Sequence, residues 1–142
     1  MLLENLCLLT AAAFAGAAFY VGFVEQPARL QLADAPLLAE WKPSYRRGAL
    51  MQASIAMIAG LLGLAAWWSS GDWRFAAGAV LMLASWPYTF AVMMPTNHAL
   101  ESTPADGAGA ASRALIEKWG RLHAARTTFG VAGTLAYLWA LS

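Results

Sequence analysis

The sequence has little charge and almost no cysteine for its length. Only 12% of its 142 residues are charged, against about 25% in an average soluble domain. The single cysteine, Cys7, excludes an internal disulfide, a Cys-x-x-Cys redox pair and a thiolate zinc site. A net charge of +1 provides no basic surface, so no nucleic-acid partner is expected. The abundant class is apolar, at 60% of residues, which excludes disorder and indicates an integral membrane protein in a lipid bilayer.

The apolar residues form four stretches without Asp, Glu, Lys or Arg. A hydrocarbon core of about 30 Å requires about 20 helical residues. The last stretch is short, and reaches that length if it starts near Leu122 and Arg126 extends to the interface. We predict an all-α membrane protein, a single four-transmembrane-helix domain over residues 1–142 arranged as an up-down bundle. The expected spans are 5–25, 48–68, 75–96 and 122–141.

The basic residues are distributed unequally between the two ends of the expected bundle. Eight of the nine lie between the first and second spans or at the third-to-fourth connection, and only Arg74 lies on the other side. The positive-inside rule therefore predicts an inner (cytoplasmic) membrane protein with the eight in the cytoplasm and both termini outside, N-out and C-out. Trp67, Trp68 and Trp73 cluster at the opposite boundary, as an aromatic belt would.

Prolines mark the expected interruptions of these helices. Pro36 and Pro43 are expected to bound a polar linker after the first span. In the third span, Pro87 and Pro95 each remove an amide donor and clash with the carbonyl four residues back, which predicts a kink near Trp86 and a break near Pro95. Broken backbone at membrane depth survives only inside protein or beside water, so a break would mark a polar cavity. The alternative is an ordinary proline kink with capped ends.

Polar side chains gather at the ends of the spans that face the cytoplasm. Such groups are costly at membrane depth and indicate function by default. Spacings of four and three residues place Trp119, His123 and Arg126 on one face of a helix expected from Ser112 onward, where they would form the wall of a pocket. The alternative is an interfacial anchor, with Trp119 among the headgroups and Arg126 extended to the interface. The other candidates at similar depth are Glu25, Tyr45, Gln52, Tyr88, Asn97 and His98.

Glu25 admits two interpretations. It is either an interfacial carboxylate paired with Arg29 four residues later, or an inward-facing proton acceptor or metal ligand. Two imidazoles and one carboxylate are the ligand set of non-haem iron, so Glu25, His98 and His123 define an alternative site for iron or, less readily, copper. These three come from separate elements without a diagnostic local spacing. Haem ligated by both histidines is disfavoured because both lie near the bilayer edge.

Four segments together resemble one family of small membrane proteins. The segment WPYTFAVMMPTN (86–97), with EQPARL, W-x-PSY-x-RG-x-x-MQA and W-x-x-LHAAR, is similar to the anthrone oxygenase-like proteins of the DUF1772 family. The resemblance covers nearly the whole chain and implies a four-helix membrane protein. It also implies oxygenase activity, because some members oxidise anthrones to anthraquinones with O2, although a shared motif does not determine the substrate. The positions that it carries over are Glu25, Tyr45, Arg46, Gln52, Tyr88, Asn97, His123 and Arg126.

The resemblance and the polar residues together suggest a mechanism without a redox cofactor. An anthrone has an acidic methylene group, and loss of one proton leaves an electron-rich anion that itself reduces O2. His123 is the candidate base because its unperturbed pKa of about 6.5 suits neutral pH. Arg126 and Asn97 would stabilise the oxyanion, and Glu25 would orient or charge-balance His123 or Arg126. The flat aromatic substrate would contact Tyr88, Trp86, Trp119, Gln52 and Tyr45.

Two other functions are compatible with the same sequence. A metal-dependent membrane oxidoreductase would use Glu25, His98 and His123 with iron or copper. A non-catalytic scaffold or assembly subunit would instead bind other helices through its tryptophans and small-residue faces, which would also permit a homo-oligomer. A transporter is disfavoured because four spans are few and the sequence has no inverted repeat.

Overall fold

The structure is a computed structural model that describes residues 1–142. It contains helices and no strands, as predicted, and the helices form four long segments. The first comprises α1 (Leu2–Tyr20), the π-helix η1 (Val21–Glu25) and α2 (Gln26–Arg29), and the second is α3 (Asp34–Ser70). The third comprises α4 (Trp73–Tyr88), the π-helix η2 (Thr89–Met93) and α5 (Met94–Ser102). A short 3-10 turn, η3 (Ala105–Gly107), leads to the fourth segment, α6 (Ala110–Leu141).

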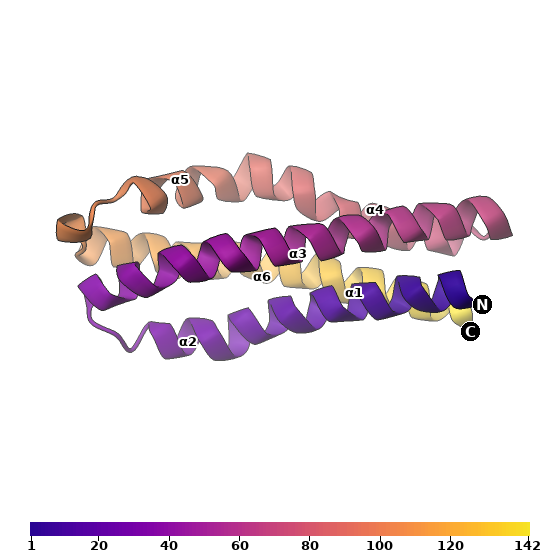
Figure 1. Ribbon diagram of the computed structural model, residues 1–142, viewed down its shortest axis with the longest axis horizontal. Coiled ribbons are helices and arrows are strands. Elements are labelled where there is room, and N and C mark those ends of the chain that lie inside the picture. The colour runs from indigo at the N-terminus through magenta and orange to yellow at the C-terminus, as the bar shows by residue number, and fades with distance from the viewer.

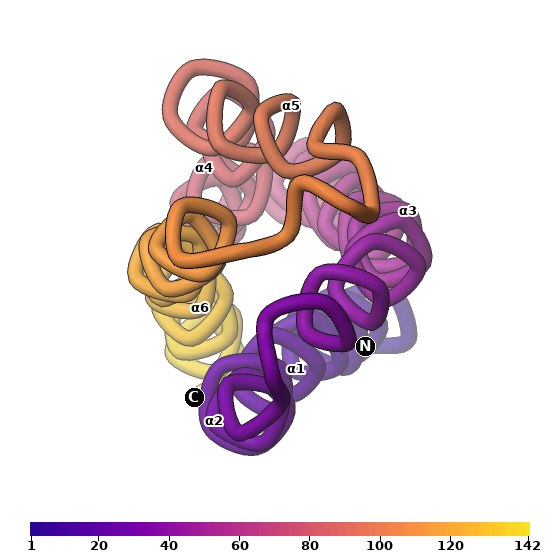
Figure 2. Tube along the Cα trace, turned by 90° about the vertical axis from the view of Figure 1, so that its left-hand side faces the viewer, coloured from indigo at the N-terminus to yellow at the C-terminus, as the bar shows by residue number.

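The four segments form an up-down bundle, with consecutive segments antiparallel (Figure 1). Both termini lie at one end, here called the terminal end, together with the tight turn at Gly71 and Asp72. The opposite end, here called the crossover end, holds the connections 30–33 and 103–109. Figure 2 shows α1 and α4 on opposite sides of the bundle axis, each packed between α3 and α6. Every segment therefore contributes one face to the interior.

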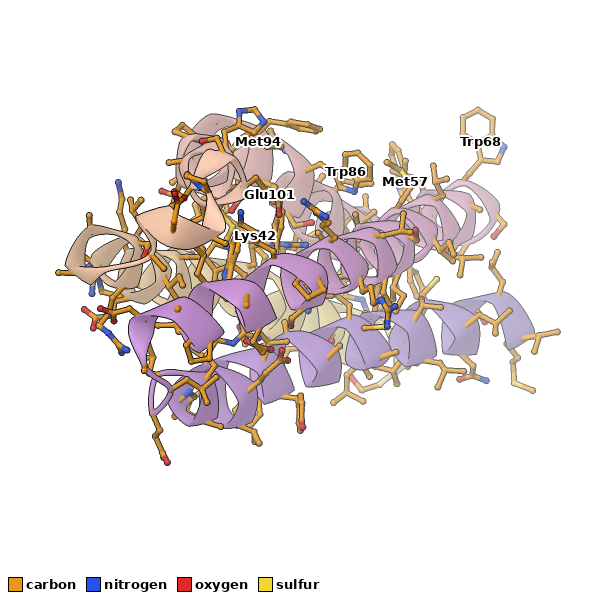
Figure 3. The ribbon with its side chains drawn as sticks, turned by 60° about the vertical axis from the view of Figure 1, so that its left-hand side comes forward. Lys42, Met57, Trp68, Trp86, Met94 and Glu101 are labelled. Carbon is orange, nitrogen blue, oxygen red and sulfur yellow. The ribbon has the colours of Figure 1, made fainter.

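Three of the segments are long and apolar enough to cross a membrane, namely Leu2–Arg29, Asp34–Ser70 and Trp73–Ser102. Trp68 projects away from the bundle at the terminal end (Figure 3), in a position suited to a membrane interface. The fourth segment, α6, differs because its middle carries Arg126. The expectation that Arg126 extends to the interface is wrong, since its side chain is buried between the helices.

The polar segment after the first span is helical, and the expectation of a linker between Pro36 and Pro43 is wrong. Pro36 lies in the first turn of α3, where the backbone N–H has no partner within the helix, so proline is tolerated. Pro43 lies inside the same helix and removes one hydrogen bond. The helix continues because Trp41 is fully buried in a cluster with Leu100 and Ile116. Burial of these large side chains offsets the lost bond.

Proline widens two helices where the sequence predicted a single break. The backbone N–H of Met94 donates to the Thr89 carbonyl, five residues back, and the next residue is Pro95. In the first segment the N–H of Gln26 likewise donates to the Val21 carbonyl, immediately before Pro27. A proline clashes with the carbonyl four residues back, and the wider π-turn makes room for it without ending the helix. Both π-turns line the cavity described below.

The core of the terminal end is closely packed around Tyr137. Its hydroxyl donates to the Ala59 carbonyl at 2.8 Å, and its ring lies against Gly63 of α3 and Gly78 of α4. A Cβ atom at either glycine would overlap the ring, so the two glycines permit the close approach of three helices. Cys7, Phe14 and Met82 belong to the same fully buried cluster, so the core of this half of the bundle is apolar.

Candidate functional site

A cavity, here called the polar cavity, lies between the middle of the bundle and the crossover end. All four helical segments line it, because the two π-turns and the facing parts of α3, α5 and α6 meet there. It contains seven of the residues that the sequence indicated: Glu25, Tyr45, Gln52, Asn97, Trp119, His123 and Arg126. The interpretation of α6 as a pocket wall is therefore favoured over that of an interfacial anchor.

His123 is held in the wall of the polar cavity with one ring nitrogen free. The residue is 2% exposed, and its Nε2 lies 3.1 Å from the Ala18 carbonyl oxygen. A carbonyl only accepts hydrogen bonds, so Nε2 carries the proton and Nδ1 carries the lone pair. Nδ1 is buried and has no partner in the chain. The His123 ring stacks on the Trp119 ring at a centroid distance of 5.0 Å, which fixes the orientation of the imidazole.

Arg126 places a positive charge inside the bundle without a counter-ion. The residue is 6% exposed, and its Nε has no hydrogen-bond partner. None of the six ion pairs of the chain includes it. Its guanidinium lies 5.7 Å from the ring centroid of Phe14, which offers only a cation–π contact. Because an unpaired buried charge is costly, this arrangement indicates a site for a negatively charged group of a ligand.

Asn97 and Gln52 add unpartnered amide groups to the same cavity. Asn97 is 1% exposed, and neither Oδ1 nor Nδ2 has a partner in the chain. Gln52 is also buried, and its Oε1 has no partner. Most buried polar groups in proteins are hydrogen-bonded, so a cluster of exceptions calls for an explanation. With Nδ1 of His123 and Nε of Arg126, these atoms offer donors and acceptors to a polar ligand.

Glu25 is paired within the chain, as one of its two interpretations predicted. Arg29 and the Ser44 hydroxyl both donate to its carboxylate, and Arg29 Nε lies 3.1 Å from Glu40. The Arg29 guanidinium also lies 5.8 Å from the ring centroid of Trp119. Arg29 is a buried cavity residue that the sequence indicated only as a partner for Glu25. The i,i+4 spacing was the available signal, but it did not reveal that both side chains reach the cavity.

The structure does not bring His98 to the site. Successive residues on a helix point about 100° apart, so α5 buries Asn97 and leaves His98 exposed. No group of three His, Cys, Asp or Glu side chains is close enough to hold a metal ion. The proposed ligand set of Glu25, His98 and His123 is therefore wrong, because one of its members faces away from the other two.

The remaining aromatic and basic candidates have separate roles in the structure. Tyr45 lines the polar cavity and stacks on Trp41 at 4.7 Å. Tyr88 lines neither this cavity nor the one beside it, because its hydroxyl donates to the Leu122 carbonyl at 2.9 Å. Arg46 is exposed and pairs with Glu101 at 2.6 Å, which joins α3 to α5 near the crossover end.

Trp86 lines a second cavity, which we call the apolar cavity. Its walls come mainly from α3 and from the α4–η2–α5 segment. The polar and apolar cavities share Tyr45, Ala49, Thr89 and Arg126, so they are neighbours separated by a common wall. Arg126 therefore forms part of the wall of both cavities.

Comparison with known proteins identifies one family. Residues 41–136 match the anthrone oxygenase family. An anthrone oxygenase of Claviceps purpurea (strain 20.1) is 32% identical over 134 residues, covering 84% of this chain and 77% of that protein. The anthrone oxygenase dmxR16 of Cryptosporiopsis sp. (strain 8999) is 30% identical over 130 residues, covering 85% and 75% respectively. No solved structure matches the chain.

Proposed function

The chain belongs to the anthrone oxygenase family, and from this premise we propose that it oxidises a flat, hydrophobic, anthrone-like substrate with O2 in the polar cavity. Family membership makes it an oxygenase-like oxidoreductase. The observation that supports this site is the set of buried, unpartnered polar atoms on His123, Arg126 and Asn97, which come from α5 and α6 and line one cavity. They supply a proton acceptor, a cation and an amide, which deprotonation of a carbon acid requires.

The proposed reaction converts a methylene group into a carbonyl group and consumes one O2. A base first removes one proton from the methylene carbon, and the electron pair left behind spreads over the rings to the carbonyl oxygen opposite. This anion reduces O2 and forms a carbon–oxygen bond. One oxygen atom becomes the new carbonyl, and the other leaves as water with the two methylene hydrogens. The substrate anion is the reductant, so the proposal needs no redox cofactor.

His123 is the proposed base. Its Nδ1 is the acceptor atom that faces no partner in the chain, and the Ala18 carbonyl holds the proton on the other nitrogen. When Nδ1 takes the substrate proton, the ring becomes a cation that the Ala18 carbonyl stabilises through Nε2–H. The stacked Trp119 ring holds the imidazole plane in place during this transfer. A positioned base of this kind contributes about 10²–10⁴-fold to a rate.

Arg126 and Asn97 are the proposed donors to the oxyanion. A fixed charge in a water-poor cavity stabilises developing negative charge more strongly than the same charge in water. Glu25 has an indirect role here, because it pairs with Arg29 and not with His123 or Arg126. Arg29 lies over the Trp119 ring, and Trp119 stacks on His123. Glu25 is therefore a positioning residue, which acts on His123 through Arg29 and Trp119. Gln52, Tyr45 and Trp119 would contact the bound substrate.

We propose an orientation for the bundle on the basis of charge. Seven of the nine basic residues lie toward the crossover end and only Arg74 lies at the terminal end, so the positive-inside rule places the crossover end in the cytoplasm with both termini outside. The polar cavity then lies toward the cytoplasmic side of the inner membrane. Accessibility of single cysteines introduced at Ser70 and Ser102 to a membrane-impermeant thiol reagent tests this orientation. Labelling of the Ser102 position from outside intact cells would contradict it.

The experiment that tests the function compares the two histidines of the chain. Purified protein in lipid nanodiscs is mixed with anthrone and O2, and anthraquinone formation and O2 uptake are followed together. We expect the wild-type protein to accelerate both. His123→Ala should lose about 10²–10⁴-fold of the rate, whereas His98→Ala, a matched change at an exposed position, should retain it.

Two results would contradict the proposal at different levels. Full activity in a folded His123→Ala protein would remove the base assignment. The absence of any acceleration by the wild-type protein would remove anthrone as the substrate. Circular dichroism and thermal unfolding of each variant establish that loss of activity is not loss of the bundle.

A further inference from the structure

The apolar cavity has no part in the proton transfer described above, yet it adjoins the site where that transfer takes place. Tyr45, Ala49, Thr89 and Arg126 belong to the walls of both cavities. The Arg126 guanidinium is buried and lacks a counter-ion. A single ligand can therefore place a polar end beside Arg126 and extend an apolar body past the shared wall.

The rim of the apolar cavity lies on the outer surface of the bundle. Its lining includes Ala53 of α3, which is partly exposed, and Phe90 of η2, which is 58% exposed. The α4–η2–α5 segment bows away from α3 at this level (Figure 1). Figure 3 labels Trp86 and Met94, which belong to this segment and line the cavity. In a membrane-spanning bundle, this side opening faces the acyl chains of the bilayer.

Trp86 supplies an unpartnered donor to the apolar cavity. The Ser85 hydroxyl donates to the Met82 carbonyl and the Thr89 hydroxyl donates to the Ser85 carbonyl, at 2.8 and 2.7 Å. The indole N–H of Trp86 is buried and donates to nothing in the chain. An indole nitrogen is only a donor, so a ligand that satisfies it must carry an acceptor oxygen.

We propose that the apolar cavity binds the fused-ring body of the substrate, which enters it from the bilayer between α3 and the α4–η2–α5 segment. Trp86 donates a hydrogen bond to an oxygen on the edge of that ring system. Ala49 and Ala53 determine how large a ring system fits, because their small side chains leave the space that the rings occupy. The inference rests on the proposed function for the reacting end of the substrate, which stays beside His123 and Arg126.

Equilibrium binding tests this inference without turnover. Anthraquinone and phenol are titrated calorimetrically into protein in nanodiscs; anthraquinone needs both cavities, whereas phenol needs the polar cavity alone. Ala53→Trp fills the apolar cavity and should weaken anthraquinone binding by about tenfold or more while leaving phenol binding unchanged. The matched control is Ala17→Trp, another partly exposed alanine, which lines an opening between α1 and α3 that adjoins the polar cavity but shares no residue with the apolar cavity. It should change neither affinity.

A second variant tests the hydrogen bond from Trp86. Trp86→Phe should weaken binding of 1,8-dihydroxyanthraquinone, which carries oxygens on its outer rings, by about fivefold, but it should not weaken binding of anthraquinone, whose two oxygens both lie on the central ring. If Ala53→Trp does not fold, Met94→Trp fills the same cavity from α5.

Three results would overturn the inference. The first is the absence of anthraquinone binding to the wild-type protein, and the second is unchanged binding in a folded cavity-filling variant. The third is a loss of anthraquinone affinity in Ala17→Trp equal to that in Ala53→Trp, which would indicate entry between α1 and α3. Because His123→Ala should abolish oxidation but still bind anthraquinone, the inference and the proposed function fail independently.

Discussion

In the terminal half of the bundle, the Tyr137 hydroxyl donates to the Ala59 carbonyl and its ring fills the space beside two glycines. Toward the crossover end, Asn97, His123 and Arg126 are equally buried but leave polar atoms without partners. All the buried side-chain nitrogen and oxygen atoms that lack a partner lie from the middle of the bundle to the crossover end. The same four helices therefore pack tightly at one end and present chemical groups at the other.

This difference separates the sources of stability from the sources of function. Unsatisfied polar groups and an unpaired guanidinium destabilise a folded protein unless a ligand satisfies them. Natural proteins tolerate such groups at functional sites when the rest of the fold offsets their cost. The closely packed apolar core around Tyr137 supplies that offset here. Substitutions in the two halves should therefore have opposite consequences.

Among substitutions that test this difference between the two halves, the largest expected effect is on the oxidation rate and comes from replacing Arg126. Arg126→Met keeps a long apolar side chain but removes the buried charge, so the oxidation rate should fall by about 10²–10³-fold, as for the loss of one oxyanion donor. The unfolding temperature should stay constant or rise, because a buried unpaired charge is lost. Steady-state kinetics with anthrone and thermal unfolding in the same nanodiscs measure both.

Arg126→Lys provides the control, since it keeps the charge but loses the planar guanidinium. Its activity should lie between those of the wild-type protein and Arg126→Met. If Arg126→Met lost stability markedly but kept its activity, Arg126 would be a structural residue. The assignment of function to the crossover half would then be contradicted.

The next effect concerns the terminal half. Gly78→Ala would place a methyl group against the Tyr137 ring, which should cost about 1–3 kcal/mol of unfolding free energy. At a temperature where the protein remains folded, the rate of anthrone oxidation should not change. Gly16→Ala is the matched control, because nothing lies within 4 Å of a Cβ atom there. Equal effects of the two substitutions would show that helix propensity, not packing, sets the stability of this half.

Tyr88 tests whether a polar group outside both cavities behaves as a structural one. Tyr88→Phe removes the donor to the Leu122 carbonyl and should cost about 0.5–1.5 kcal/mol of unfolding free energy. The KM for anthrone should remain unchanged, because the ring packs on Phe129 and lines neither cavity. A raised KM without a loss of stability would instead support the substrate contact that the sequence indicated.

The smallest effect involves an exposed pair at the terminal end. Hydrogen bonds from the Arg74 side chain lower the pKa of the Asp72 carboxyl group. A lowered pKa in the folded protein stabilises it at neutral pH, and this gain disappears as the pH falls below about 3.9, through the folded pKa. Asp72→Asn keeps the helix cap but removes the charge.

The stability difference between the wild-type protein and Asp72→Asn should therefore be small at pH 7 and should shrink on acidification. Thermal unfolding of both proteins between pH 7 and pH 3 measures it. A difference that does not vary with pH would assign the contribution of Asp72 to hydrogen-bond geometry and not to its charge.

Several features of the site were predictable because they depend on local sequence. His123 and Arg126 share a helix face through their spacing, and the i,i+4 pair of Glu25 and Arg29 follows from the same rule. Proline at position 95 predicted a disturbance of the helix beside a polar cavity. The form of that disturbance was not predictable, because a π-turn and a broken helix relieve the same clash.

The sequence by itself determined the class of the protein. The length of its apolar stretches and their lack of charge are properties of the chain alone, and they predict a four-helix membrane bundle. The tertiary structure decided which polar groups share a cavity. Asn97 and His98 are neighbours in the chain, but only Asn97 faces the interior, and Tyr88 bonds to α6. The rotation of each helix about its axis depends on packing against the other three, which no local pattern encodes.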